Sequence, residues 1–102
     1  MIVVITSCGS REEAERIAAA LVGERLAACV QILPATSIYR WKGVVEQAEE
    51  HVLHVKTRAA QADRVGARVR AMHSYALPEL IMVPVAGGSP DYLAWVEAET
   101  QS

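Results

Sequence analysis

The sequence predicts an α+β fold of the ferredoxin-like type, with the element order β-α-β-β-α-β and a short C-terminal helix. Two observations support this prediction. Strand-like and helix-like segments follow one another in this order, and two prolines, Pro34 and Pro84, fall in the second and fourth strands, which this topology places at the sheet edges. The chain has 102 residues, and we expect a single domain over residues 1–102.

The first strand and helix have clear signals. Residues 2–6 form a continuous apolar and β-branched run, which is typical of a buried strand. A helix is expected to begin at Ser10, because Ser10 and Glu13 have the spacing of a capping box. Its core-facing residues recur at helical spacing: Ala14, Ile17, Ala18, Leu21 and Val22.

Residues 28–57 predict a long two-stranded hairpin with Lys42 and Gly43 in the turn. Each arm has about fourteen residues, whereas an average strand has about 5–6 and the first strand offers about six partners. The overhang would expose strand edges and the rings of Tyr39 and Trp41, which is an aggregation hazard in a monomer. We therefore expect an oligomer, with Tyr39 and Trp41 at its interface.

The second half repeats the pattern. The apolar residues of a predicted second helix share one face: Ala62, Val65, Val69 and Met72. A last strand is expected over residues 80–85, after Pro78. Ser89 then has the position of an N-cap, with Pro90 at the first position of a final helix. The rings of that helix, Tyr92 and Trp95, are expected in the core or in an interface.

Composition excludes several classes of function. The net charge of −2 gives no electrostatic basis for binding nucleic acid or an anionic membrane surface. An RNA-recognition motif is also excluded, because the chain has no phenylalanine and no aromatic pair on its first or third strand. No apolar stretch approaches the length of a membrane span. We expect no signal peptide, since the chain starts on a strand-like run, and two cysteines favour a reducing cytoplasm.

His73, Tyr75 and Glu79 form a polar cluster after the second helix. One interpretation is a metal or acid–base site. The other is structural: His73 would complement the helix dipole, and Pro78 would end the connection. The sequence leaves both interpretations open. No serine or cysteine lies in a nucleophile motif, so we do not expect an enzyme.

Three further groups are interpreted as mainly structural. His51 and His54 are separated by an odd number of strand positions, so they point to opposite faces and cannot chelate one ion. Cys8 ends the first strand, where crevices form, but the C-x-x-C of a soft-metal chaperone is absent. The acidic stretch is interpreted as a solvated face: Glu46, Glu49 and Glu50.

Five blocks of the chain resemble CutA, the divalent-cation-tolerance family: ERLAACVQILP, SIYRWKG, HVLHVKT, HSYALPEL and DYLAWV. The resemblance covers nearly the whole chain. It implies a ferredoxin-like subunit in a homotrimer similar to the PII signalling proteins. The family is cytoplasmic in bacteria and is linked to tolerance of copper and other divalent cations, without a settled biochemical activity, and the resemblance implies the same here.

The copper ligands described in that family are a cysteine at the end of the first strand and two adjacent histidines after the second helix. Here these positions hold Thr6 and the pair Met72-His73, with Cys8 two residues beyond Thr6. The predicted metal ligands are therefore His73, Cys8, Met72 and Glu79, with copper as the preferred ion. We expect the His73 ring to lie at the end of a helix and to reach solvent.

The function predicted from the sequence is a trimeric, non-enzymatic cation-tolerance protein that binds copper or another divalent cation weakly near His73 and requires no cofactor. Two alternatives remain open. One is a PII-like regulatory module that binds a small anionic ligand in a cleft between subunits, where Lys56, Arg40 and Lys42 would supply positive charge. The other is a rigid assembly scaffold in which all these sites are structural.

Overall fold

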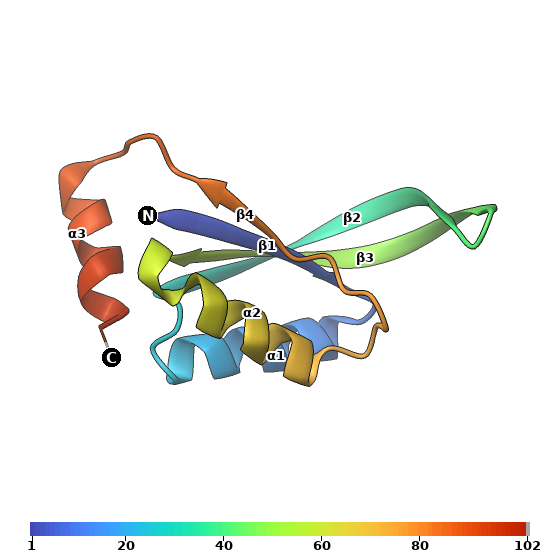
Figure 1. Cartoon of the computed structure of the whole chain (residues 1–102), viewed down its shortest axis with the longest axis horizontal. Coiled ribbons are helices and arrows are strands. Elements are labelled where there is room, and N and C mark those ends of the chain that lie inside the picture. The colour runs from blue at the N-terminus through green and yellow to red at the C-terminus, as the bar shows by residue number, and fades with distance from the viewer. Residues whose placement is uncertain (102) are drawn as a thin grey trace.

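The computed structural model describes residues 1–101 and contains a four-stranded antiparallel sheet with two helices packed on one face (Figure 1). The elements, in chain order, are β1 (Ile2–Cys8), α1 (Arg11–Gly23), β2 (Cys29–Trp41), β3 (Val44–Thr57), a 3₁₀ turn (Ala59–Gln61), α2 (Ala62–Met72), β4 (Ile81–Pro84) and α3 (Pro90–Glu99). This order confirms the predicted ferredoxin-like fold.

The strands lie in the order β2-β3-β1-β4, so β2 and β4 are the edge strands, as predicted. Pro34 of β2 lies opposite His51, and Pro84 of β4 lies opposite Ile2. Both prolines therefore lie on edge strands, where a missing N–H donor is tolerated best.

The core lies between the sheet and the two helices α1 and α2 (Figure 1). Alternate residues of the central strands, such as Val4, Leu53 and Val55, are completely buried against the helices. The strand residues between these buried ones point to the second face of the sheet, which α1 and α2 leave uncovered. Val83 lies on that face and is 42% exposed. Among residues 1–101, no helix combines the length and apolar character needed to cross a bilayer.

The predicted hairpin is confirmed and extends well beyond the rest of the sheet (Figure 1). β1 pairs only with residues 51–57 of β3, so residues 44–50 are paired with β2 alone. Lys42 and Gly43 both have positive φ angles, 51° and 81°, which suits the tight turn that joins the strands. Apolar side chains of the overhang are exposed, with Ile38 at 68% and Val45 at 60%.

β1 ends at Cys8, as predicted, because β3 offers partners as far as His51. The predicted bounds of the last strand were wrong by one residue at each end. β4 covers Ile81–Pro84 and not residues 80–85, since it pairs with only the first four residues of β1.

The predicted capping box is also wrong in one half. The Ser10 hydroxyl accepts the Glu13 N–H at 3.2 Å, as expected of an N-cap. The Glu13 carboxylate, however, does not return to the Ser10 backbone; it accepts both the N–H and the hydroxyl of Ser74. Glu13 therefore connects α1 to the segment that follows α2.

α3 is attached through its C-terminal carbonyl groups. The Gln61 amide and the Arg58 guanidinium both donate to the Thr100 carbonyl, at 2.7 and 3.0 Å. The rings of Tyr92 and Trp95 are 39% and 43% exposed, so they do not belong to the core of this chain. The Ser89 hydroxyl accepts the Tyr92 N–H, which confirms the predicted N-cap.

Candidate metal site and the adjacent pocket

Cys8, Glu13 and His73 come together where β1 ends and α2 ends. One possible ligand atom from each residue lies within 4.8 Å of the others. β1 supplies the thiol, the first turn of α1 supplies the carboxylate, and the C-cap of α2 supplies the imidazole. We refer to these three residues as the Cys8–Glu13–His73 cluster.

Both nitrogens of the His73 ring already have protein partners. Nδ1 lies 3.1 Å from the Tyr75 N–H, which can only donate, so Nδ1 is the acceptor. Nε2 then has the proton and donates to the Ser7 carbonyl at 2.7 Å. The predicted access of this ring to solvent is wrong, since the His73 side chain is 0% exposed.

The Glu13 carboxylate is charged and points at the same imidazole. Burial opposes its charged form, but the two hydrogen bonds from Ser74, helped by His73 and Arg16, outweigh burial and lower the pKa of Glu13. Glu13 Oε1 lies 3.3 Å from His73 Nδ1. Two electron-rich atoms therefore approach each other, and a cation between them would be stabilised by both.

The Cys8 thiol is completely buried, and its Sγ lies 3.9 Å from His73 Nε2. Burial, and then the charges of Glu13 and Glu50, raise the pKa of this thiol to about 11. The order thiol–imidazole–carboxylate resembles that of a nucleophilic enzyme, but a reactive cysteine needs a low pKa and access for the substrate. Cys8 has neither, and the same raised pKa means that a metal could bind the sulfur only with loss of the thiol proton.

The structure brings together two of the four predicted ligands. Cys8 and His73 are neighbours, whereas Met72 packs against the hydrophobic core and Glu79 accepts the Ser7 hydroxyl at 2.8 Å. Glu79 does not belong to the cluster of potential ligands found among the described residues. Sequence reasoning missed Glu13, because the spacing Ser10–Glu13 is also that of a capping box.

The cations proposed for an anion cleft are not together within one chain. Arg40 and Lys42 lie at the tip of the hairpin, and Arg40 pairs with Val45. Lys56 lies at the other end of β3, roughly 36 Å from Val45 at the usual rise of a strand, where its ammonium contacts the Tyr92 ring. A cleft with all three cations would need residues from more than one subunit.

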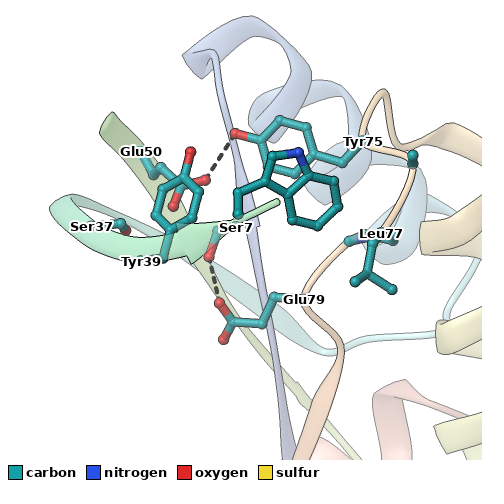
Figure 2. Close-up of a pocket in the computed structure, with 10 residues that line it drawn as sticks. Ser7, Ser37, Tyr39, Glu50, Tyr75, Leu77 and Glu79 are labelled. Carbon is teal, nitrogen blue, oxygen red and sulfur yellow. Dashed lines mark hydrogen bonds between the residues drawn. The ribbon is translucent and has the colours of Figure 1, made fainter. Parts of the chain in front are cut away.

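A pocket of about 660 Å³ lies along the overhang of the hairpin (Figure 2), and its residues Ser7 and Tyr75 contact the cluster. Its lining residues come from β1, β2, β3 and the segment before β4: Ser7, Ser37, Tyr39, Trp41, Glu50, Tyr75, Ala76, Leu77, Pro78 and Glu79. Glu50 accepts the Tyr75 hydroxyl at 2.8 Å and is partly exposed, so it has a protein partner as well as contact with solvent. Burial and this hydrogen bond raise the pKa of Tyr75.

Two pocket residues, Ser7 and Tyr75, are hydrogen-bonded to His73 of the cluster. The Ser7 carbonyl accepts from His73, and its hydroxyl donates to Glu79 in the pocket. The Tyr75 N–H donates to His73, and its hydroxyl donates to Glu50. A change in the hydrogen bonds of His73 therefore acts directly on the pocket wall.

Comparison with known proteins identifies the family. The sequence model described as "CutA1 divalent ion tolerance protein" matches residues 2–99. This chain belongs to the CutA1 family. The resemblance seen in the sequence is thereby confirmed.

CutA1 relatives match most of this chain. The "Divalent-cation tolerance protein CutA" of Thermus thermophilus is 46% identical over 99 residues, which is 96% of each chain. "Protein CutA, chloroplastic" of Arabidopsis thaliana is 39% identical over 102 residues, and this chain spans only 56% of its length.

Solved CutA1 structures have the same fold. The Thermus thermophilus protein has a TM-score of 0.95, with 99% of this chain and 100% of that chain covered. A "PII-like protein CutA" from Nostoc sp. PCC 7120 has a TM-score of 0.93 and is 35% identical, with 99% and 98% covered. These likenesses confirm the predicted architecture of the subunit.

Proposed function

We propose that this CutA1-family chain is a trimeric, non-enzymatic cation-tolerance protein that binds a thiophilic cation at the Cys8–Glu13–His73 cluster. The main support is the convergence of a thiol, a carboxylate and an imidazole within 4.8 Å. Membership of a divalent-ion tolerance family agrees with this assignment. The single-domain unit over residues 1–102 and a cytoplasmic location are parts of the same proposal.

The donor set favours copper and zinc over magnesium and calcium. Sulfur and imidazole nitrogen are ligands of Cu(I), Cu(II) and Zn²⁺, whereas Mg²⁺ and Ca²⁺ prefer oxygen ligands alone. Binding has two costs, because Cys8 must lose a proton and His73 must give up one hydrogen bond. We therefore expect modest affinity.

The test is isothermal titration of wild type and three single variants with Zn²⁺, Cu(I) and Mg²⁺. His73→Ala, Cys8→Ser and Glu13→Gln should each weaken zinc and copper binding at least tenfold, and no protein should bind Mg²⁺ comparably. His54→Ala is the matched control. His54 pairs with Ile5, so its side chain points to the face of the sheet opposite to that of Cys8. His51 is less suitable, since it lies directly opposite Cys8. Equal binding by wild type and His73→Ala would contradict the proposal.

A second candidate function is that of a PII-like regulatory module, which the likeness to the Nostoc protein favours. In this version a small anionic ligand lies between subunits, with Lys56 of one subunit near Arg40 and Lys42 of another. A thermal-shift screen of nucleotides and organic anions tests it. Stabilisation that is lost in Lys56→Ala would support the module; if neither metals nor anions bind, the rigid scaffold remains.

The cytoplasmic location rests on the two free cysteines and needs its own test, because a plant relative is named chloroplastic. Fractionation of the source cells with an antibody against this chain decides it. Recovery of the protein outside the cytoplasmic fraction would contradict this part of the proposal.

A further inference from the structure

Tyr75 connects His73 of the cluster to the overhang of the hairpin. Its backbone N–H donates to His73 Nδ1 at 3.1 Å, and its ring lies beside the imidazole, with 4.8 Å between the two centroids. Its hydroxyl donates to Glu50 at 2.8 Å (Figure 2). Glu50 belongs to the overhang, because it lies one position beyond the part of β3 that β1 covers. One residue therefore contacts both the proposed metal site and the hairpin.

The geometry favours Nδ1 of His73 as the nitrogen that binds a metal. Nδ1 is an acceptor and lies 3.3 Å from Glu13 Oε1. Two ligands of one tetrahedral zinc ion, each about 2.0–2.2 Å from it, are separated by about 3.3–3.5 Å. Cys8 Sγ lies 3.9 Å from Nε2, but Nε2 has the proton and the shorter hydrogen bond, 2.7 Å to the Ser7 carbonyl. A backbone carbonyl on the second nitrogen is the usual support of a histidine that binds a metal.

A metal at Nδ1 must displace the Tyr75 N–H, because an imidazole nitrogen has one lone pair and cannot serve both partners. The backbone of Tyr75 can shift, since residues 73–80 contain no helix or strand. The side chain has little room to compensate for that shift. Its ring lies beside the imidazole, and its hydroxyl lies so close to Gly9 that an added Cβ would come within 3.0 Å. Displacement of the N–H therefore disturbs the bond from Tyr75 to Glu50.

We infer that Tyr75 competes with the metal for His73 Nδ1, so that binding of a thiophilic cation releases Glu50 and loosens the overhang from the segment after α2. The inference rests on the proposed function, because it needs a metal at the Cys8–Glu13–His73 cluster. It adds two roles: Tyr75 lowers the metal affinity, and the hairpin responds to occupancy of the site. It applies equally when a neighbouring copy covers the overhang, since all these contacts lie within one chain.

Zinc titration of Tyr75→Phe tests the competition. The variant keeps the backbone N–H and the ring but loses the bond to Glu50, so displacement of Tyr75 should cost less. Because coupling between two sites is reciprocal, zinc binding should tighten at least threefold. In a Glu50→Gln background the same change should have a smaller effect, since the hydroxyl then has a neutral acceptor. Tyr92→Phe is the matched control: it removes the hydroxyl of an equally exposed tyrosine in α3 and should bind zinc like wild type.

Trp41 provides a second measurement, of the hairpin itself. The chain has two tryptophans, so Trp95→Phe leaves Trp41 as its only indole. In this background, zinc should make Trp41 of the assembled protein more accessible to quenching by acrylamide. The addition of Tyr75→Phe should abolish the response, because the bond that zinc disturbs is then absent before zinc is added.

The metal site and the competition fail in different ways. If wild type does not bind zinc, or if His73→Ala binds it equally well, the metal site is wrong and the inference is wrong with it. If zinc binding depends on His73 but Tyr75→Phe does not tighten it, the metal site stands and the competition is wrong. Tighter binding without a zinc response of Trp41 would overturn the link to the hairpin. Circular dichroism and light scattering on each variant establish that the fold and assembly are unchanged.

Discussion

His73 is fixed at the residue scale by two backbone groups, the Ser7 carbonyl and the Tyr75 N–H. Such a histidine supports structure without a metal, because it connects β1 to the segment after α2. It becomes a ligand only when one of these hydrogen bonds is exchanged for a bond to a cation. Under the proposed function, the structural and metal-binding interpretations of His73 are two states of one arrangement, and the charge of Glu13 would favour the bound state.

Glu13→Gln should destabilise the protein in a pH-dependent way. The pKa of Glu13 is lowered on folding, so its charged form contributes stability that is present above the ordinary value of 4.5 and lost as the pH falls through the folded value. At pH 7 the variant should lose about 2 kcal/mol, because hydrogen bonds to a charged acceptor weaken. Chemical unfolding at pH 7 and pH 3 measures the difference.

The difference between wild type and Glu13→Gln should shrink at pH 3, where the carboxyl group approaches the neutral state. Glu12→Gln is the control, because Glu12 is an exposed residue of the same helical turn. A Glu13→Gln deficit of the same size at both pH values would show that the charge of Glu13 does not matter.

Zinc binding at the cluster should release a proton from Cys8. Because the thiol pKa is raised to about 11, Cys8 is protonated at pH 7 and must ionise to bind a metal. The affinity of wild type for Zn²⁺ should therefore rise about tenfold per pH unit between pH 7 and 8. Titrations in buffers of different ionisation enthalpy count the released protons.

Cys8→Ser separates the contribution of the Cys8 proton to the pH dependence of zinc binding from the contributions of other groups. The variant should bind more weakly and lose the pH dependence, since a serine hydroxyl does not ionise in this range. A wild-type affinity that is constant from pH 7 to 8, with no proton release, would exclude Cys8 as a ligand.

At the scale of the elements, the turn of the hairpin depends on one glycine. Gly43 has a φ angle of 81°, and a Cβ added there would meet nothing within 4 Å. Gly43→Ala should therefore lower the free energy of unfolding by about 1 kcal/mol through backbone strain alone. Gly87→Ala is the matched control, because Gly87 has equal open space and no positive φ. Equal melting temperatures of the two variants would contradict the argument.

Local sequence signals predicted the elements well, because their causes lie within a few residues. The N-caps at Ser10 and Ser89, and the turn at Lys42 and Gly43, depend on neighbours one to three positions away. The edge prolines followed from the element order. These features allowed the fold to be predicted from one sequence.

The sites were harder to predict, because their contacts join distant segments. Glu13 and Ser74 are separated by 61 positions, and Glu50 and Tyr75 by 25. A capping-box spacing and an acidic stretch are common in sequences without such contacts, so neither contact could be predicted from them. The burial of His73 has the same origin: its ring is covered by β1 and α1, which precede it by about sixty residues.

At the scale of the whole molecule, the hairpin is a surface that one chain does not cover. β2 is an edge strand of 13 residues, and β1 covers only the part of β3 from His51 to Thr57. The exposed side chains of the overhang include large apolar residues: Ile38, Tyr39, Trp41, Val44 and Val45. Long apolar edges of this kind favour pairing with another chain.

The protein should therefore form a trimer in solution, with Trp41 buried by a neighbouring subunit. In a closed cyclic assembly, each subunit covers the exposed hairpin of its neighbour, so no hairpin remains uncovered. Open-ended pairing would lead to fibres. Light scattering coupled to size exclusion should give three times the 11.1 kDa mass of the chain. Trp41, which is 43% exposed in the single chain, should become protected from quenching by acrylamide.

Trp41→Ala tests the same prediction through the interface. If a neighbour encloses the ring, its removal should weaken assembly by about 3–5 kcal/mol per subunit, as for other large-to-small changes. Trp95→Ala removes an equally exposed indole from α3 and is the matched control for loss of a tryptophan. A monomer mass for wild type at micromolar concentration would contradict the trimer. A trimer of unchanged stability in Trp41→Ala would instead place the interface away from the hairpin, and the pocket at its base would then be open to solvent in the assembled protein.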